Sequence, residues 1–139
     1  MFETLMTNDL TDDPRKLSAL ISRVSSLASE YSVPSVLVGL VADVGDTTFP
    51  EYIHYLQSAL RVEDGIFRMT RERAVVHLAD VDREQAEQVM ERLAEAFSDE
   101  FPALSRLNIR TQVYEAKPDT EELRVKDILT RIFVASTFH

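Results

Sequence analysis

The sequence has 139 residues, 45% of them hydrophobic and 28% charged, which fits a globular protein with one hydrophobic core. Its 24 acidic and 15 basic side chains give a formal net charge of -9, which argues against non-specific nucleic-acid binding and against an anionic membrane surface. The absence of cysteine excludes disulfides and cysteine-built metal sites. No apolar run is long enough to span a bilayer, and the first residues lack the features of a signal peptide, so we expect a cytoplasmic protein.

The first half of the chain predicts a helix followed by a buried strand. Residues 1–11 are expected to form a polar N-terminal leader. Asp12-Asp13-Pro14 is a helix start, because a carboxylate caps the first turn and proline is tolerated there. Apolar residues then recur at helical spacing, which predicts a helix ending near Tyr31. The β-branched run at 35–43 predicts a central strand covered on both faces.

The middle of the chain predicts a second helix and a hairpin. A loop at 44–50 leads to a helix at 51–60, and two apolar runs between 65 and 79 predict paired strands. The turn between them is Thr70-Arg71-Glu72-Arg73. Tight hairpin turns usually contain glycine, asparagine or aspartate, because they need positive φ angles, and this turn contains none of them.

The last part predicts helix, strand and helix. Asp82 caps a helix at 83–97. Residues 107–114 alternate between apolar and polar, which predicts a strand with one face toward solvent, and a final helix is predicted at 120–135. The order α-β-α-β-β-α-β-α indicates an α/β (α+β) sandwich, with helices packed on a mainly antiparallel sheet.

Several short sequence motifs, which occur in the same order, resemble those of the GGDEF domain of bacterial diguanylate cyclases. Residues 8–15 are similar to the phrase D-x-L-T-G-L-P-N-R, and residues 60–69 to L-R-x-x-D-x-x-x-R. Asp43 matches the first aspartate of a strand ending in D-x-D, and the turn at 70–74 stands where G-G-[DE]-E-F belongs. The resemblance covers residues 8–134. It implies the palm-like fold of nucleotidyl cyclases, with a single GGDEF-like domain over residues 12–139.

Two departures from the family pattern concern catalysis. Thr70 and Arg71 replace the glycine pair that lets the backbone approach the nucleotide, and Arg73 replaces the second acid. The segment at 44–60 is shortened and lacks the family's F-K-x-x-N-D phrase. Asp43 and Glu72 fall on the positions that hold metal in the family, and we interpret them as a strand-end acid and a turn acid. We therefore expect no metal, no cofactor and no enzymatic activity.

Arg61 and Asp64 are the candidate ligand-binding residues. In the family, R-x-x-D at this place forms an inhibitory site for cyclic di-GMP, in which arginine contacts phosphate or guanine and aspartate accepts from guanine. The alternative interpretation is a surface Arg–Asp pair that closes the turn from helix to strand. Both interpretations remain open from the sequence.

Arg68, Arg71 and Arg73 are predicted to lie together at the hairpin tip. They form either a solvated turn or a partner-binding surface, since arginine is enriched at interaction hot spots. The histidines show no metal-ligand spacing, and His77 is expected to be packed or at a strand edge.

The sequence thus predicts a degenerate, catalytically inactive GGDEF-like domain with a regulatory or protein-interaction role and an unidentified protein partner. The alternative is a receptor for cyclic di-GMP, or another nucleotide, that binds through Arg61 and Asp64. A third hypothesis is a homodimer built on the exposed face of the strand at 107–114.

Overall fold

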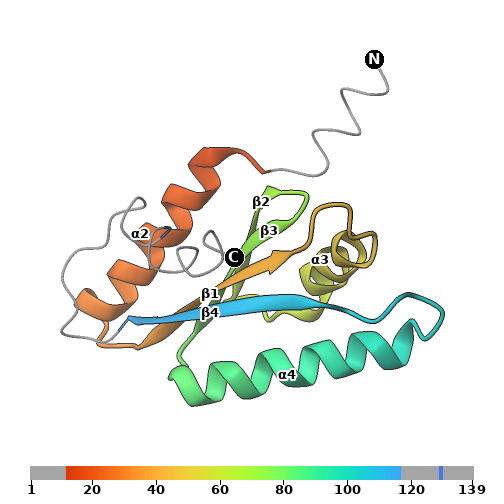
Figure 1. Cartoon of the computed structure of the whole chain (residues 1–139). Helices are drawn as coiled ribbons and strands as arrows, with labels where there is room; N and C mark the ends of the chain where they lie inside the picture. Colours follow the sequence, from red (N-terminus) through yellow and green to blue (C-terminus); the bar gives the residue numbers. More distant parts are fainter. Residues whose placement is uncertain (1–11, 117–128, 130–139) are drawn as a thin grey trace.

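The computed structural model describes residues 12–116 and residue 129 (Figure 1). Its elements are α2 (Pro14–Glu30), β1 (Ser35–Ala42), α3 (Thr48–Ala59), β2 (Gly65–Thr70), β3 (Arg73–Ala79), α4 (Arg83–Glu100) and β4 (Ile109–Ala116). This order is the predicted one. The predicted leader at 1–11 and the predicted helix at 120–135 lie outside the described residues, apart from Leu129.

The four strands form one sheet in the order β2-β3-β1-β4, and each neighbouring pair is antiparallel. All eight residues of β1 are buried. The predictions of a central strand covered on both faces and of an antiparallel sheet with packed helices are therefore confirmed. The edge strands β2 and β4 come from the middle and the end of the described part.

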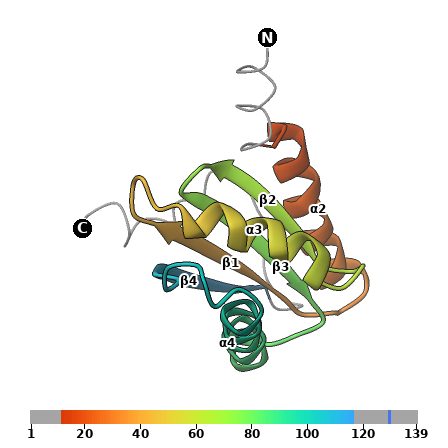
Figure 2. The same ribbon diagram turned by 90° about the vertical axis from the view of Figure 1, so that its right-hand side faces the viewer.

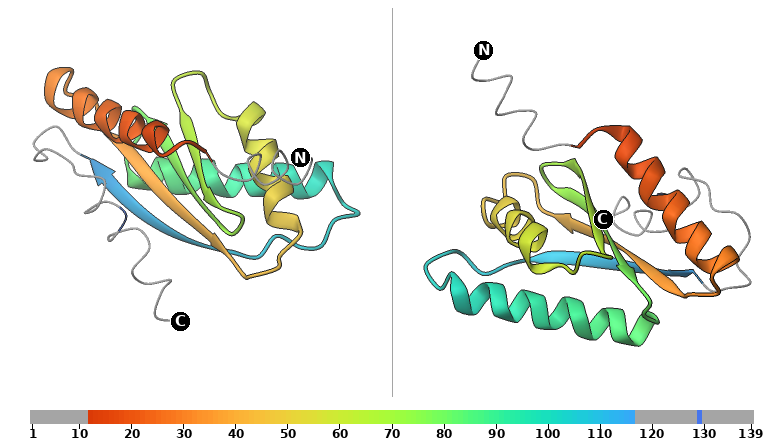
Figure 3. Two further views of the ribbon diagram at one scale, coloured as in Figure 1. Left: turned by 90° about the horizontal axis from the view of Figure 1, so that it is seen from above. Right: turned by 180° about the vertical axis from the view of Figure 1, so that it is seen from behind.

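Helices cover both faces of the sheet. In Figure 1, α2 lies on one side of the strands and α4 on the other, and Figure 2 shows α3 and α4 together on the same face. Seen from above, α2 crosses the strands while α4 lies behind them (Figure 3). Side chains of β1 alternate accordingly: Val36 and Leu40 join the core under α3 and α4, whereas Leu37 and Val41 join the core under α2.

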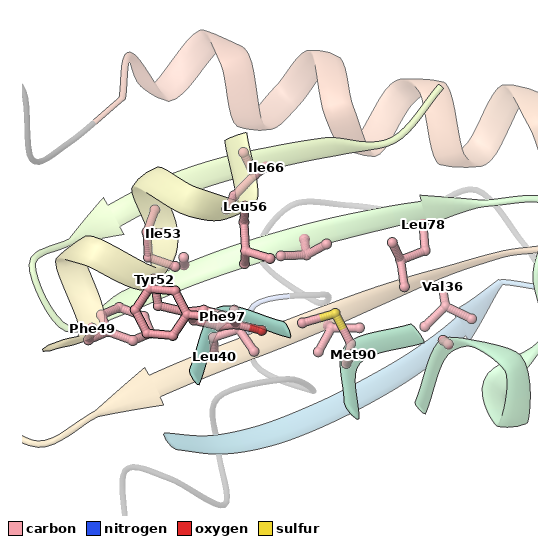
Figure 4. Close-up of a cluster of buried hydrophobic side chains, with 14 of the residues drawn as sticks. Val36, Leu40, Phe49, Tyr52, Ile53, Leu56, Ile66, Leu78, Met90 and Phe97 are labelled. Carbon is pink, nitrogen blue, oxygen red and sulfur yellow. The ribbon is translucent and has the colours of Figure 1, made fainter. Parts of the chain in front are cut away.

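The larger core lies between the sheet and the helices α3 and α4 (Figure 4). Tyr52 of α3 and Phe97 of α4 are both fully buried there, with ring centroids 5.2 Å apart in an edge-to-face arrangement. Such a pair adds to the stabilisation from burying apolar area. It fixes α3 against α4 and so holds the first turns of α3 in place above the hairpin.

The start of α3 differs from the prediction. The helix begins at Thr48, so the last three residues of the predicted loop at 44–50 are helical. The reason is Asp46, whose Oδ1 accepts hydrogen bonds from the backbone N–H groups of Thr48 (2.8 Å) and Phe49 (2.9 Å). Pro50 is tolerated because an N–H in the first turn has no partner within the helix.

The ends of α4 and β4 also differ from the prediction. Asp82 caps α4 as predicted and forms a reciprocal capping box with Gln85, but the helix continues three residues beyond Phe97. β4 is shifted by two residues, because its pairing with β1 runs from Ile109 opposite Ala42 to Ala116 opposite Ser35. Burial along β4 does not alternate from one residue to the next, so the prediction that one face of this strand points toward solvent is wrong.

Among residues 12–116 and 129, no helix combines the length and the apolar character that crossing a bilayer requires.

Candidate functional site

The tip of the β2–β3 hairpin is a turn that does not need glycine. Arg71 and Glu72 form the turn, and the strand register shifts between Arg68 and Thr70. Among the described residues other than glycine, only Ser32 and Asp80 have positive φ, so both turn residues lie in ordinary backbone regions. The irregular register therefore explains how the chain reverses without the residues that a tight hairpin turn requires.

The hairpin tip is attached to the neighbouring strand and to itself. The backbone N–H of Ala42, the last residue of β1, donates to the carbonyl of Glu72 (2.8 Å). The backbone N–H of Glu72 donates to Oγ1 of Thr70 (3.2 Å). One backbone donor of the turn is thus already occupied by a side chain.

A cavity of about 530 Å³ separates the hairpin tip from the first turns of α3. Its lining includes Pro50, Ile53 and His54 of α3, and Arg68, Arg71 and Arg73 of the hairpin. The three arginines, which the sequence predicted to lie together at the hairpin tip, therefore line the same cavity. Pocket volumes of 300–1,000 Å³ are common for ligand sites, so about 530 Å³ is sufficient for one.

The three arginines differ in their surroundings. Arg71 is exposed at the turn, whereas Arg68 and Arg73 are half-buried. The guanidinium of Arg68 forms an ion pair with Asp12, with Nη2 2.9 Å from Oδ1. Arg71 is therefore the member of the cluster that is most accessible to a partner.

Asp12 also covers the outer edge of β2. Its backbone N–H donates to the carbonyl of Arg68 (2.9 Å), and its Oδ2 accepts from the backbone N–H of Arg68 (2.7 Å). Burial of Asp12 raises the pKa of its carboxyl, but the hydrogen bonds from Arg68 outweigh this and lower the pKa overall. An edge strand blocked in this way is protected against pairing with another chain at that residue. Sequence analysis had assigned Asp12 only to the start of a helix.

Asp43 and Glu72 are the two acids at the positions that hold metal in GGDEF domains. Asp43 lies at the end of β1, and Glu72 lies in the turn of the β2–β3 hairpin. Asp43 follows β1, and its Oδ1 is 3.0 Å from Nη1 of Arg110 on β4. Arg110 pairs with Val41 across the two strands, which places it diagonally opposite Asp43. Asp43, Glu72, Arg73 and Arg110 together line a hollow of about 350 Å³.

These residues are poorly suited to hold a divalent metal. One carboxylate is already paired with an arginine, and two arginines line the same hollow. In the described part of the chain, no three acidic, histidine or cysteine side chains come together as metal ligands. Divalent cations such as Mg²⁺ need several oxygen ligands, and added positive charge opposes their binding.

Arg61 and Asp64 are in direct contact at the turn between α3 and β2. Nε of Arg61 donates to Oδ2 of Asp64 (2.9 Å) and Nη2 donates to Oδ1 (2.8 Å). The backbone N–H groups of Arg61 (3.2 Å) and Ala79 (3.0 Å) donate to the same carboxylate. Nη2 of Arg61 also donates to the carbonyl of Ala79 (2.6 Å), which ties the turn to the end of β3.

Asp64 is buried, while Arg61 is half-exposed. The side chain of Asp64 is 2% exposed and that of Arg61 is 48% exposed. Burial alone would raise the pKa of the Asp64 carboxyl, and the hydrogen bonds from Arg61 and Ala79 more than compensate, so its pKa lies below the usual value. Arg61 thus presents a cationic surface, whereas the Asp64 carboxylate faces inward.

His77 is a buried group on the α2 side of the sheet. It is 1% exposed, and burial lowers its pKa to about 4, with Arg23 and Arg61 acting in the same direction and Asp64 opposing them. Within the described residues, its Nε2 has no hydrogen-bond partner. It is therefore a packed neutral histidine, which was one of the two expectations from the sequence.

Comparisons with known proteins support the fold. The sequence matches no family model, and no curated protein matches it. The GGDEF domain of FimX from Pseudomonas aeruginosa superposes with a TM-score of 0.68 and 11% identity over 89% of this chain and 85% of that one. The GGDEF domain of DgcB from Caulobacter crescentus, solved in complex with c-di-GMP, superposes with a TM-score of 0.64 and 15% identity. The match covers 94% of this chain and 89% of that one.

A third similar structure is a larger protein. PelD from Pseudomonas aeruginosa PAO1, in a chain beginning at its residue 158, superposes with a TM-score of 0.63 and 20% identity over 83% of this chain. The match covers 42% of the PelD chain, so this protein spans less than half of it. At these identities the three structures show the fold alone. The chain has the fold of GGDEF domains, as the sequence resemblance implied.

Proposed function

We propose that this protein is a catalytically inactive GGDEF-like domain that acts as a regulatory or protein-interaction module, with Arg68, Arg71 and Arg73 as the partner-binding residues. A shared fold does not fix a function, so the proposal depends on the residues of the site.

The ion pair between Arg110 and Asp43 is the observation that carries this proposal. A palm-type cyclase needs carboxylates that hold divalent metal against the phosphates of its substrate. Here the carboxylate of Asp43 lies 3.0 Å from a guanidinium, which cannot lose its proton in a protein. An arginine thus supplies positive charge beside the carboxylate to which a metal would have to bind, and this supports the proposal that no metal is held there.

The hairpin turn supports the same conclusion. Thr70 and Arg71 carry side chains where the family has two glycines, and both side chains line the cavity beside the turn. Loss of close backbone approach removes both the binding and the orientation of a nucleotide. Selection for an interaction surface is consistent with a preserved core and an altered cleft.

The proposal is tested by an activity assay and by crosslinking. The purified protein is incubated with GTP and Mg²⁺ or Mn²⁺, and cyclic di-GMP is measured by chromatography beside an active diguanylate cyclase. We expect no product, and product formation would overturn the proposal. A photo-crosslinking amino acid at position 71 is expected to capture a protein partner in cells, while the same amino acid at Arg92, an exposed residue of α4, captures none.

The second candidate function is a cyclic di-GMP receptor that uses Arg61 and Asp64. Two observations favour it: Arg61 is half-exposed, and the DgcB domain of the same fold was solved with c-di-GMP. Because Asp64 is buried and its carboxylate already accepts four hydrogen bonds, such a ligand would contact Arg61 first.

Calorimetric titration with cyclic di-GMP tests this second candidate. Micromolar or tighter binding that is lost in Arg61→Ala and retained in Glu63→Gln would support it, provided that both variants keep the melting cooperativity of the parent. Glu63 is the control, because its half-exposed carboxylate lies 3.7 Å from Nη1 of Arg61, so Glu63→Gln changes the charge beside the arginine and leaves the arginine itself in place. Absence of binding would leave the interaction module as the function.

A further inference from the structure

The cavity between α3 and the hairpin tip combines positive charge with an apolar floor. Three arginines and one glutamate, Glu51, line it among the described residues. Ile53 and Ala74 are both buried and contribute apolar atoms to the same lining. A ligand that fits this space needs negative charge at its outer end and an apolar group that reaches inward.

The local charge is opposite to that of the whole chain. The formal net charge is -9, but electrostatic interactions in physiological salt are screened over about 8 Å. A group that enters the cavity therefore interacts mainly with the lining charges, which are three arginines and Glu51, with Arg68 paired to Asp12. Arg71 is the one exposed arginine of the three, so it is the most accessible to an incoming anion.

One backbone N–H of the hairpin turn is not free to bind a phosphate. Phosphate sites in proteins are commonly built from several free backbone N–H groups at a turn or helix start. At this turn, the N–H of Glu72 is taken by Thr70 Oγ1, and the carboxylate of Glu72 lies beside the arginines in sequence. Recognition therefore depends on guanidinium side chains, whose planar fork binds carboxylates and phosphates alike, and the adjoining apolar lining favours a peptide segment that carries both acidic and apolar groups.

Beside the cavity, the edge of β2 is closed to strand addition at Arg68. β2 is an edge strand, but Asp12 occupies both the N–H and the carbonyl of Arg68. Strand addition needs these backbone groups to be free. The cavity, by contrast, is open to side chains arriving over the turn.

We propose that this cavity is the binding site for a segment of a protein partner in which acidic residues flank an apolar residue, with the acids on Arg71 and its neighbours and the apolar side chain over Ile53 and Ala74. This inference rests on the proposed protein-interaction function and names the chemistry of the partner.

The test uses a fluorescently labelled peptide, Glu-Glu-Leu-Glu-Glu, with blocked ends, and measures its anisotropy as the 139-residue protein is added. We expect binding that weakens as salt is added and that is absent for the matched peptide Gln-Gln-Leu-Gln-Gln. In Arg71→Gln the affinity is expected to fall about tenfold, as for the loss of one charge-assisted hydrogen bond. Arg92→Gln, which removes an exposed arginine of α4, is expected to leave the affinity unchanged.

Three outcomes would overturn the inference: no binding of the acidic peptide, an equal effect of both arginine variants, or tighter binding of inorganic pyrophosphate than of the peptide. The last result would make the cavity a phosphate site. Failure of the peptide while position 71 still crosslinks a protein partner would remove only this inference. Failure of both experiments would remove the proposed function as well.

Discussion

The carboxylate of Asp64 accepts four hydrogen bonds, and two of them come from the guanidinium of Arg61. The other two come from the backbone N–H groups of Arg61 and Ala79. This arrangement joins the end of α3, the start of β2 and the end of β3 at one buried charge. The pair is thus a structural element of the fold whether or not it also contacts a ligand.

Asp64→Ala is expected to destabilise the protein strongly. The substitution leaves the part-buried N–H of Ala79 and the exposed N–H of Arg61 without their acceptor and removes the partner of the Arg61 guanidinium, which together cost about 2–4 kcal/mol. Urea denaturation followed by circular dichroism measures the change. A loss below about 0.5 kcal/mol, the usual range for surface substitutions, would show that this buried pair contributes little to stability.

Asp43→Ala is expected to have almost no effect on stability. The side chains of Asp43 and Arg110 are 63% and 46% exposed, and exposed ion pairs contribute about 0–1 kcal/mol. The same urea titration measures this, with Asp64→Ala as the contrasting variant. A loss above about 2 kcal/mol, beyond the range of exposed pairs, would show that the Asp43–Arg110 pair supports the sheet.

Local signals explain the parts of the fold that the sequence predicted correctly. The capping of α2 by Asp13 and of α4 by Asp82 depends on residues within three positions of the helix start, and both were predicted from that spacing. The burial of β1 on both faces followed from its nearly continuous run of apolar residues, three of them valines.

The site residues that sequence analysis missed depend on pairing between distant elements. Arg110 meets Asp43 only because β4 adds to β1 in a particular register, and no pattern near either residue indicates that register. Asp12 meets Arg68 across 56 positions of the chain. The predicted arginine cluster was found, but its cavity required the position of α3, whose start depends on the side-chain cap from Asp46.

Stability is expected to fall as the pH is lowered from 7.5 to 5, because of His77. Its folded pKa is about 4 and its ordinary value is 6.5, so in this window the unfolded chain binds a proton that the folded protein does not. The expected loss from this group is about 2 kcal/mol. The carboxyls of Asp12 and Asp64 have lowered pKa values, so their stabilisation is lost only below the ordinary value of 3.8.

His77→Gln provides the control for this pH dependence. The variant cannot titrate near neutral pH, so its free energy of unfolding should change less between pH 7.5 and 5 than that of the parent, even if it is less stable at both. Urea titrations at the two pH values give the comparison. Identical pH dependence in both proteins would show that His77 does not titrate with a depressed pKa.

Asp12→Ala is expected to loosen the outer edge of β2. The ion pair to Arg68 and the hydrogen bond to its backbone N–H are lost, at a cost of about 1–3 kcal/mol. Hydrogen exchange of the Arg68 amide should become faster than in the parent, while exchange of the Val38 amide in the central strand should change only as much as global stability does. Unchanged exchange at Arg68 would contradict the role of Asp12 as an edge cover.

Tyr52→Phe is expected to leave the protein as stable or to stabilise it. Tyr52 is fully buried beside Phe97, burial raises the pKa of its phenol, and within the described residues its hydroxyl has no hydrogen-bond partner. Removing a buried hydroxyl that lacks a partner removes a desolvation cost, so a gain of up to about 1 kcal/mol is expected in urea denaturation. Tyr55→Phe is the control, because the Tyr55 side chain is only half-buried and its ring contacts with Phe97 and Phe101 do not need the hydroxyl. A clear loss of stability in Tyr52→Phe alone would indicate that a bound water satisfies the hydroxyl in solution, since buried waters commonly bridge such groups.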